Sequence, residues 1–200
     1  MMPLLCLFCH PATPDLRAGR FPADTPLDTR GHAAAAQAAA SLTQRYPDAA
    51  LFCSPALCAR QTAEAFGPQA TPTAALADVD YGAWRGKSLA DIVRDQPQAA
   101  QAWLRDPAMR SHGGEAFADV ITRVGAWLDA LDLQGNGIAI THPAVIRAAL
   151  VHVMGAPAEA WFRLEPAPLS QIELRRSARG WLWSLSSPAT AQTSLRTTRS

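Results

Sequence analysis

Three short apolar runs, each followed by polar or proline-containing sequence, constrain the fold of this chain more than any other feature. They cover residues 4–9, 49–53 and 138–141, and each is almost wholly apolar. Continuous apolar runs of this length are typical of strands buried on both faces of a parallel sheet. Helical patterns separate the runs along the chain. The sequence therefore predicts an α/β fold built on a mainly parallel sheet.

The remaining segments supply the helices and a final pair of strands. Asp28 or Thr29 can cap the first long helix, and Ser54-Pro55 offers a cap and a first-turn proline for the second. Alternating apolar residues predict a closing antiparallel strand pair at 171–174 and 181–185. In all, helices are expected at residues 28–45, directly after Ser54, and at 88–95, 97–105, 115–131 and 143–154. Loops are expected at 10–27 and 66–87.

Length and charge limit the classes of function. Two hundred residues suit one domain, which we expect to span residues 1–186, with a loose tail at 187–200. The 18 basic and 17 acidic side chains nearly balance, so we expect no nucleic-acid partner. The chain lacks an apolar stretch of the ~18 residues a membrane span needs, and its N-terminal run has no basic flank. These features predict a cytoplasmic protein without a membrane partner.

Each of the three buried runs ends in side chains that can react or form hydrogen bonds, namely Cys9-His10, Cys53-Ser54 and Thr141-His142. The carboxyl ends of parallel strands share one edge of a sheet, and ligands bind beyond that edge. Two histidines beside helix starts suit an anion, because free backbone N–H groups and the helix dipole favour negative charge there. The sequence therefore predicts an anion pocket between His10 and His142.

Several motifs, in order, carry a resemblance to a known family. They are Cys-His-Pro at 9–11, Gly-Arg at 19–20, Asp-Thr-Pro-Leu at 24–27, Ser-Pro-Ala-Leu-Cys-Ala-Arg-Gln-Thr-Ala at 54–63, Leu-Ala-Asp-Val-Asp-Tyr-Gly-Ala-Trp-Arg-Gly at 76–86, Gly-Gly-Glu at 113–115 with Arg123, and Thr-His at 141–142. The set resembles the histidine phosphatase superfamily. The resemblance implies a phosphoglycerate mutase-like, three-layer α/β/α sandwich with a mainly parallel central sheet and an antiparallel last strand.

The same resemblance implies a mechanism. His10 would attack phosphorus and carry a transient phosphohistidine, which divides hydrolysis into two easier steps. His142 would donate hydrogen bonds to the phosphoryl oxygens. Asp78 matches the family's acid, although it is one methylene shorter than the usual glutamate. Asp80 and Glu115 are alternatives for the acid, and Glu115 also belongs to the expected phosphate site.

Two departures from the family pattern weaken this expectation. Cys9 and Cys58 occupy the positions of the two arginines that hold the phosphoryl group in the family. Two lost charge-assisted hydrogen bonds correspond to about 3–6 kcal/mol. Arg17 and Arg20, on the loop after the first strand, are the expected substitutes in phosphate binding. Prolines also replace the glycine that follows each histidine, at Pro11 and Pro143.

Two readings of the function therefore stay open. The first is a slow phosphomonoesterase acting on a small phosphorylated metabolite, without a cofactor or a resident metal, and able to form a homodimer. The second is an inactive scaffold that binds an anion, a metal or a protein partner. For the second reading, Cys9, Cys58, His10 and His142 would offer thiols and imidazoles to a thiophilic metal, and the two thiols could instead form a disulfide. Both cysteines can equally be small, buried replacements in a lapsed site.

Overall fold

The computed structural model of the chain describes residues 3–178 and 180–185. Its centre is a six-stranded sheet with the strand order β3-β2-β4-β1-β5-β6. The first four strands in this order are mutually parallel, and β5 joins β1 in an antiparallel pair that β6 then extends. The strands are β1 (Leu4–Cys9), β2 (Ala50–Cys53), β3 (Thr71–Pro72), β4 (Gly137–Thr141), β5 (Gln171–Ser177) and β6 (Gly180–Leu185).

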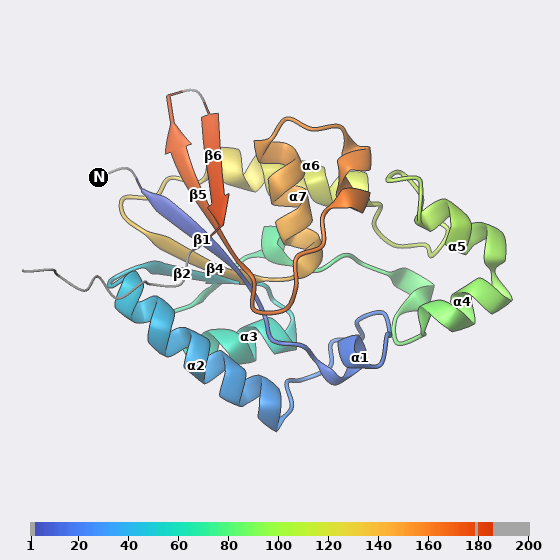
Figure 1. The fold of residues 1–200 in the computed structure, drawn as a ribbon, viewed down its shortest axis with the longest axis horizontal. Helices are drawn as coiled ribbons and strands as arrows, with labels where there is room; N and C mark the ends of the chain where they lie inside the picture. The colour runs from blue at the N-terminus through green and yellow to red at the C-terminus, as the bar shows by residue number, and fades with distance from the viewer. Residues whose placement is uncertain (1–2, 179, 186–200) are drawn as a thin grey trace, which may run out of the picture.

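Helices cover the two faces of this sheet (Figure 1). On one face lie α2 (Thr29–Arg45) and α3 (Leu57–Glu64), and on the other lie α6 (Phe117–Ala130) and α7 (Pro143–Val153). The short helix α1 (Pro14–Arg17) follows β1, while α4 (Leu89–Asp95) and α5 (Pro97–Trp103) lie at one end of the molecule. The result is the predicted three-layer arrangement with a mainly parallel sheet.

The side chains of β1 alternate between the two helical layers. Leu5, Leu7 and Cys9 belong to the core shared with α6 and α7. Leu4, Cys6 and Phe8 belong to the core shared with α2 and α3. Successive side chains of a strand point to opposite faces, so this separation follows from strand geometry alone. All six residues are buried, as expected for a central strand.

A third apolar cluster lies beyond the sheet. Phe21, from the loop after β1, packs with Trp84, Ile92, Ala100 and Met109. Backbone hydrogen bonds join the loop to the start of α4, because the Phe21 N–H donates to Lys87 O and the Gly86 N–H donates to Phe21 O, each at 2.9 Å. This cluster builds a wall above the carboxyl ends of the parallel strands.

Most of the predicted elements are confirmed, and a few expectations were wrong. The loop predicted at 10–27 contains α1, which starts with a Thr13 cap and Pro14 in its first turn. The segment 66–87, expected to be irregular, contributes the edge strand β3. The helix after Ser54 begins only at Leu57 and has no side-chain cap, so the expected Ser54 cap is absent from it. Asp28 does cap α2, where its carboxylate accepts from the Gly31 N–H.

Two further expectations concern the ends of the chain and the membrane. The expected tail at 187–200 lies outside the described residues, so the boundary of the predicted domain stays a prediction. Within residues 3–178 and 180–185, no helix has the length and apolar character needed to cross a membrane.

Candidate active site

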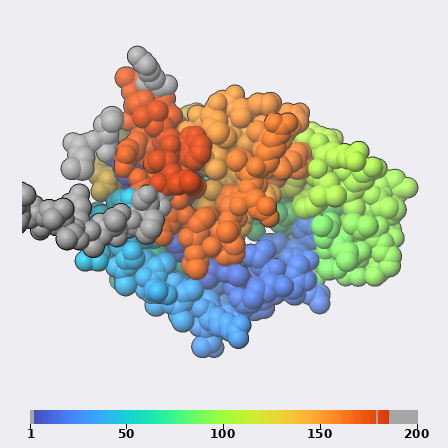
Figure 2. Space-filling view, viewed as in Figure 1, coloured from blue at the N-terminus to red at the C-terminus, as the bar shows by residue number. Residues whose placement is uncertain are grey.

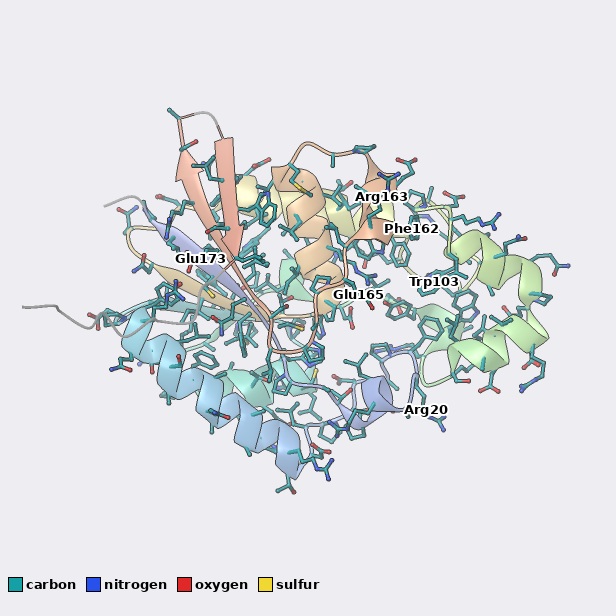
Figure 3. All side chains as sticks on the ribbon, in the orientation of Figure 1. Arg20, Trp103, Phe162, Arg163, Glu165 and Glu173 are labelled. Carbon is teal, nitrogen blue, oxygen red and sulfur yellow. The ribbon has the colours of Figure 1, made fainter. Side chains whose placement is uncertain are left out.

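A cavity of about 530 Å³ opens at the carboxyl ends of β1 and β4. Figure 2 shows a hollow here, bounded by the loop after β1, the α4–α5 segment and the chain that follows α7. Trp103 of α5 and Arg20 of the loop lie on its two sides (Figure 3). The charged and histidine side chains of the lining are His10, Asp15, Arg20, Asp24, Asp78, Asp80, Arg85, His142 and Arg147.

His10 follows β1 directly and is 5% exposed. Its Nδ1 lies 2.6 Å from the carbonyl oxygen of Pro11, which can only accept a hydrogen bond. The hydrogen bond therefore assigns the proton of the neutral ring to Nδ1 and leaves the lone pair on Nε2. Burial, and then the neighbouring charge of His142, lower the pKa of His10 to about 4. The ring is neutral at pH 7 and has one nucleophilic nitrogen.

His142 occupies the matching position after β4, where it is the N-cap residue of α7 and precedes Pro143. Its Nε2 lies 2.7 Å from Ser54 Oγ. The ring centroids of the two histidines are 4.9 Å apart, in an edge-to-face arrangement. Burial, and then the charge of Arg123, lower the pKa of His142 to about 3. The structure thus brings the two predicted histidines into contact across the cavity.

The side chain of Asp78 also lies in the cavity, beside His142. Its Oδ2 lies 3.4 Å from His142 Nδ1, and its Oδ1 accepts a 2.9 Å hydrogen bond from the Val79 N–H. The side chain is 16% exposed, and burial raises the pKa of its carboxyl group. A raised pKa favours the protonated acid, which is the form that can protonate a leaving group. The shorter side chain of aspartate therefore does not keep the carboxyl group out of the cavity.

A network behind the cavity fixes the segment that carries Asp78. Arg123 of α6 forms an ion pair with Glu115 at 2.7 Å and donates to the carbonyl oxygens of Ala75 and Ala77. The Thr141 hydroxyl donates to Leu76 O at 2.8 Å. Glu115 thus lies outside the cavity lining, with its carboxylate engaged by Arg123 behind the segment that carries Asp78.

Gly114, directly before Glu115, explains how the chain there packs against the segment that carries Asp78 and Asp80. A side chain at Gly114 would place a Cβ 1.9 Å from the carbonyl oxygen of Asp80. The Glu115 N–H donates to that same oxygen at 2.8 Å. The motif therefore allows a close backbone contact, while the Asp80 side chain itself lines the cavity.

The two cysteines in arginine positions differ in their surroundings. Cys58, on α3, lines the cavity and is 5% exposed. Cys9 has no exposed surface and packs in the core beneath α6 and α7, so it lies outside the cavity lining. The cause is strand alternation, which turns Cys9 to the face opposite α3. All four cysteines are free thiols, and burial raises the pKa of Cys58 to about 12.

The arginines proposed as substitutes also differ. Arg17 forms an ion pair with Asp28 and donates to Ala12 O at 2.6 Å, outside the cavity lining. Arg20 lines the cavity and donates to Gly86 O at 3.2 Å. Of the two, only Arg20 lies where a ligand can contact it.

Sequence reasoning missed two arginines of the lining, Arg85 and Arg147. The guanidinium carbon of Arg147 lies 5.7 Å from the centroid of the Trp161 ring, and its Nε has no hydrogen-bond partner among the described residues. Its place one helical turn after Pro143, the first residue of α7, was the available signal. Arg85 is part of the motif at 76–86 but was not considered as a ligand contact.

The fold and the facing histidines define a phosphoglycerate mutase-like α/β protein. The chain belongs to the histidine phosphatase superfamily (branch 1), whose family model matches residues 5–187. This match confirms the resemblance to the family.

Solved structures of other proteins share this fold. A mycobacterial glucosyl-3-phosphoglycerate phosphatase is 25% identical, with a TM-score of 0.78, over 92% of this chain and 97% of that one. The alpha-ribazole phosphatase of Shigella flexneri is 20% identical, with a TM-score of 0.79, over 91% of this chain and 95% of its own; this likeness supports the fold alone.

Curated relatives match shorter parts of their own sequences. The 6-phosphofructo-2-kinase/fructose-2,6-bisphosphatase of Caenorhabditis elegans is 29% identical over 143 residues, which make up 70% of this chain and 31% of that protein. A bifunctional protein of Mycobacterium tuberculosis is 29% identical over 92 residues. The match covers 25% of the length of that protein.

Proposed function

We propose that this protein is a phosphomonoesterase that acts on a small phosphorylated metabolite through a phosphohistidine on His10. The observation that carries the proposal is the 2.6 Å contact between Nδ1 of His10 and the carbonyl oxygen of Pro11, which assigns the ring tautomer. Its Nδ1–H is held by Pro11 O, so the Nε2 lone pair faces a cavity that also contains His142 and Asp78. The phosphatase names of its relatives support the same reaction class.

The first step transfers the phosphoryl group to the enzyme. His10 Nε2 forms a bond to phosphorus, the bond from phosphorus to the ester oxygen breaks, and the Asp78 carboxyl group gives its proton to the departing oxygen. His142 donates a hydrogen bond to the phosphoryl oxygens, where negative charge is concentrated. The alcohol then leaves and Asp78 is a carboxylate.

The second step reverses these roles. A water molecule enters, the Asp78 carboxylate takes its proton, and the resulting hydroxide attacks phosphorus. The bond between phosphorus and His10 Nε2 then breaks, which returns the neutral imidazole and releases inorganic phosphate. The step consumes one water and needs no redox cofactor.

The two cysteines set the expected rate. Neither Cys9 nor Cys58 can donate the charge-assisted hydrogen bonds that an arginine would supply. Arg20, Arg85 and Arg147 provide the cationic side chains of the cavity. We therefore expect turnover to be about 10²–10⁴-fold below that of a family member with both arginines.

A rapid-quench experiment tests the proposal. The protein is mixed with a panel of phosphomonoesters labelled in the phosphoryl group and quenched, and the label on the protein is then characterised. We expect an acid-labile, base-stable label that His10→Ala abolishes. His32→Ala is the matched control, because His32 is an exposed residue of α2 that lies outside the cavity lining.

Cysteine at the two arginine positions of the family favours one competing function, an inactive scaffold that binds an anion or a partner. Equal label or equal turnover in wild type and His10→Ala would contradict the nucleophile. Absence of turnover across the panel, with phosphate binding that depends on His10 and His142, would favour the scaffold.

A further inference from the structure

Three metal-ligating side chains meet inside the cavity. One ligand atom of each of His10, Cys58 and His142 lies within 4.8 Å of the other two, and all three residues are buried. We propose that these residues bind a thiophilic metal ion of the Zn²⁺ type at the place where the phosphoryl group would otherwise sit. The proposal stands apart from the phosphatase activity, because binding of the metal needs no turnover.

The imidazoles are oriented as metal ligands require. A ligating histidine uses one ring nitrogen for the metal, and its other nitrogen is held by an outer hydrogen bond. Here Pro11 O holds Nδ1 of His10 at 2.6 Å, and Ser54 Oγ holds Nε2 of His142 at 2.7 Å. The free nitrogens are Nε2 of His10 and Nδ1 of His142.

His142 Nδ1 gives an independent indication of a missing ligand. It is buried and has no hydrogen-bond partner among the described residues, because the contact with Asp78 at 3.4 Å lacks hydrogen-bond geometry. A buried polar nitrogen without a partner costs free energy, which a bound cation would recover.

The donor set and the spacing suit tetrahedral zinc. Zn–N bonds of about 2.0–2.1 Å and Zn–S bonds of about 2.3 Å place neighbouring ligand atoms about 3.3–3.8 Å apart. Side-chain movements of about 1 Å would close the observed spacing. Three protein ligands and one open position are the arrangement of catalytic and inhibitory zinc sites, in which water takes the fourth place.

Charge favours a cation at this point more than in a family member that keeps its arginine. Cys58 stands where the family places a guanidinium, which would repel a metal ion. A Cys58 thiolate and two neutral imidazoles leave one positive charge on a bound Zn²⁺. That charge would favour the ionised form of the nearby Asp78 carboxyl group, which then offsets it. Cys9 takes no part, because its side chain lies in the core on the other face of the sheet.

Cobalt titration of metal-free protein, purified without a histidine tag, tests the site. We expect one Co²⁺ per chain, with a near-ultraviolet thiolate charge-transfer band that one equivalent of Zn²⁺ removes. Cys58→Ser and Cys58→Ala should lose that band and weaken Zn²⁺ binding at least tenfold. Cys53→Ala is the matched control, because Cys53 is also a buried thiol but lies outside the cavity lining. Its titration should equal that of wild type.

Two outcomes would overturn the site. One is less than stoichiometric binding of Co²⁺ and Zn²⁺ by correctly folded wild type. The other is a thiolate band that persists in both Cys58 variants. Metal-free protein that shows no turnover but binds Co²⁺ through Cys58 would support this site and contradict the phosphatase. Metal-free protein that is active and gives no band with Co²⁺ would do the reverse. His142→Gln supplies a second arm, in which we expect a weakened but still thiolate-type spectrum.

Discussion

The ends of β1 and β4 carry the same dipeptide, His-Pro, but place it in different surroundings. After β1, His10 enters a loop and donates through Nδ1 to the carbonyl oxygen of Pro11. After β4, His142 caps α7, and its Nε2 contacts Ser54. The hydrogen bonds therefore leave Nε2 free on one ring and Nδ1 on the other. Outer contacts, and not residue type, distinguish the two rings, and the nucleophile and hydrogen-bond donor proposed above follow from that difference.

Replacing each histidine in turn gives the largest expected contrast. His10→Ala should lower kcat by at least about 10³-fold and abolish the phosphoryl label, because the nucleophile is gone. His142→Ala should lower kcat by about 10²–10³-fold but keep the label, because only charge stabilisation is lost. Single-turnover kinetics with the labelled ester would measure both. If His142→Ala lost the label and His10→Ala kept it, His142 would be the nucleophile and His10 the hydrogen-bond donor.

Asp78→Asn separates the histidines from the acid. The amide cannot protonate a leaving oxygen, so we expect kcat for an alkyl phosphate to fall about 10²–10³-fold. For 4-nitrophenyl phosphate, whose leaving group needs no proton, the loss should be much smaller. Steady-state rates on both esters provide the test, and an equal loss on both would exclude Asp78 as the general acid.

Restoring an arginine tests the two cysteine positions against each other. Cys58→Arg places a guanidinium in the cavity and should raise kcat/KM at least about tenfold, corresponding to about 1.4 kcal/mol. Cys9→Arg should instead lower Tm without such a gain, because it buries a charge in the core beneath α6 and α7. A gain in kcat/KM for Cys9→Arg at unchanged Tm would show that the arginine reaches the ligand from the core.

Ser54→Ala removes the outer contact of His142 and should have a moderate effect. One neutral hydrogen bond contributes about 0.5–1.5 kcal/mol, which corresponds to a roughly two- to tenfold fall in kcat/KM. Ser170→Ala serves as a control at a partly buried serine, whose hydroxyl has no hydrogen-bond partner among the described residues. An unchanged kcat/KM in Ser54→Ala would mean that packing alone orients the ring.

The smallest of the expected effects is the change in kcat/KM with pH near neutrality. His10 attacks only when its ring is neutral, and burial lowers its pKa to about 4. Activity should therefore be lost as the pH falls through about 4, and the titration of His10 should change kcat/KM less than twofold between pH 7 and 5.5. Initial rates at constant ionic strength would measure this. An acid limb with an apparent pKa near 6.5 would indicate a solvated histidine.

The sequence allowed the sheet, the strand ends and both histidines to be predicted, because apolar runs and helix starts are local patterns. The side-chain direction of Cys9 was not predicted, since it depends on which helical layer each strand face meets. The contact between Ser54 and His142 joins residues 88 positions apart. Its geometry follows from the packing of β2 beside β4, which no local pattern contains.

The apolar cluster around Phe21 and Trp84 is a part of the molecule whose side chains can be exchanged separately from those at the strand ends of the sheet. The two facing histidines directly follow β1 and β4 of the sheet, whereas Phe21, Tyr81 and Trp103 line the cavity from that outlying cluster. Phe21 is tied to Lys87 and Gly86 by backbone hydrogen bonds, and Trp103 also packs against Phe117 of the core beneath α6 and α7. We therefore expect exchange of its aromatic side chains to change the organic group that the cavity accepts while the phosphoryl chemistry proposed for His10 is kept. Under that proposal, recognition and reaction diverge independently.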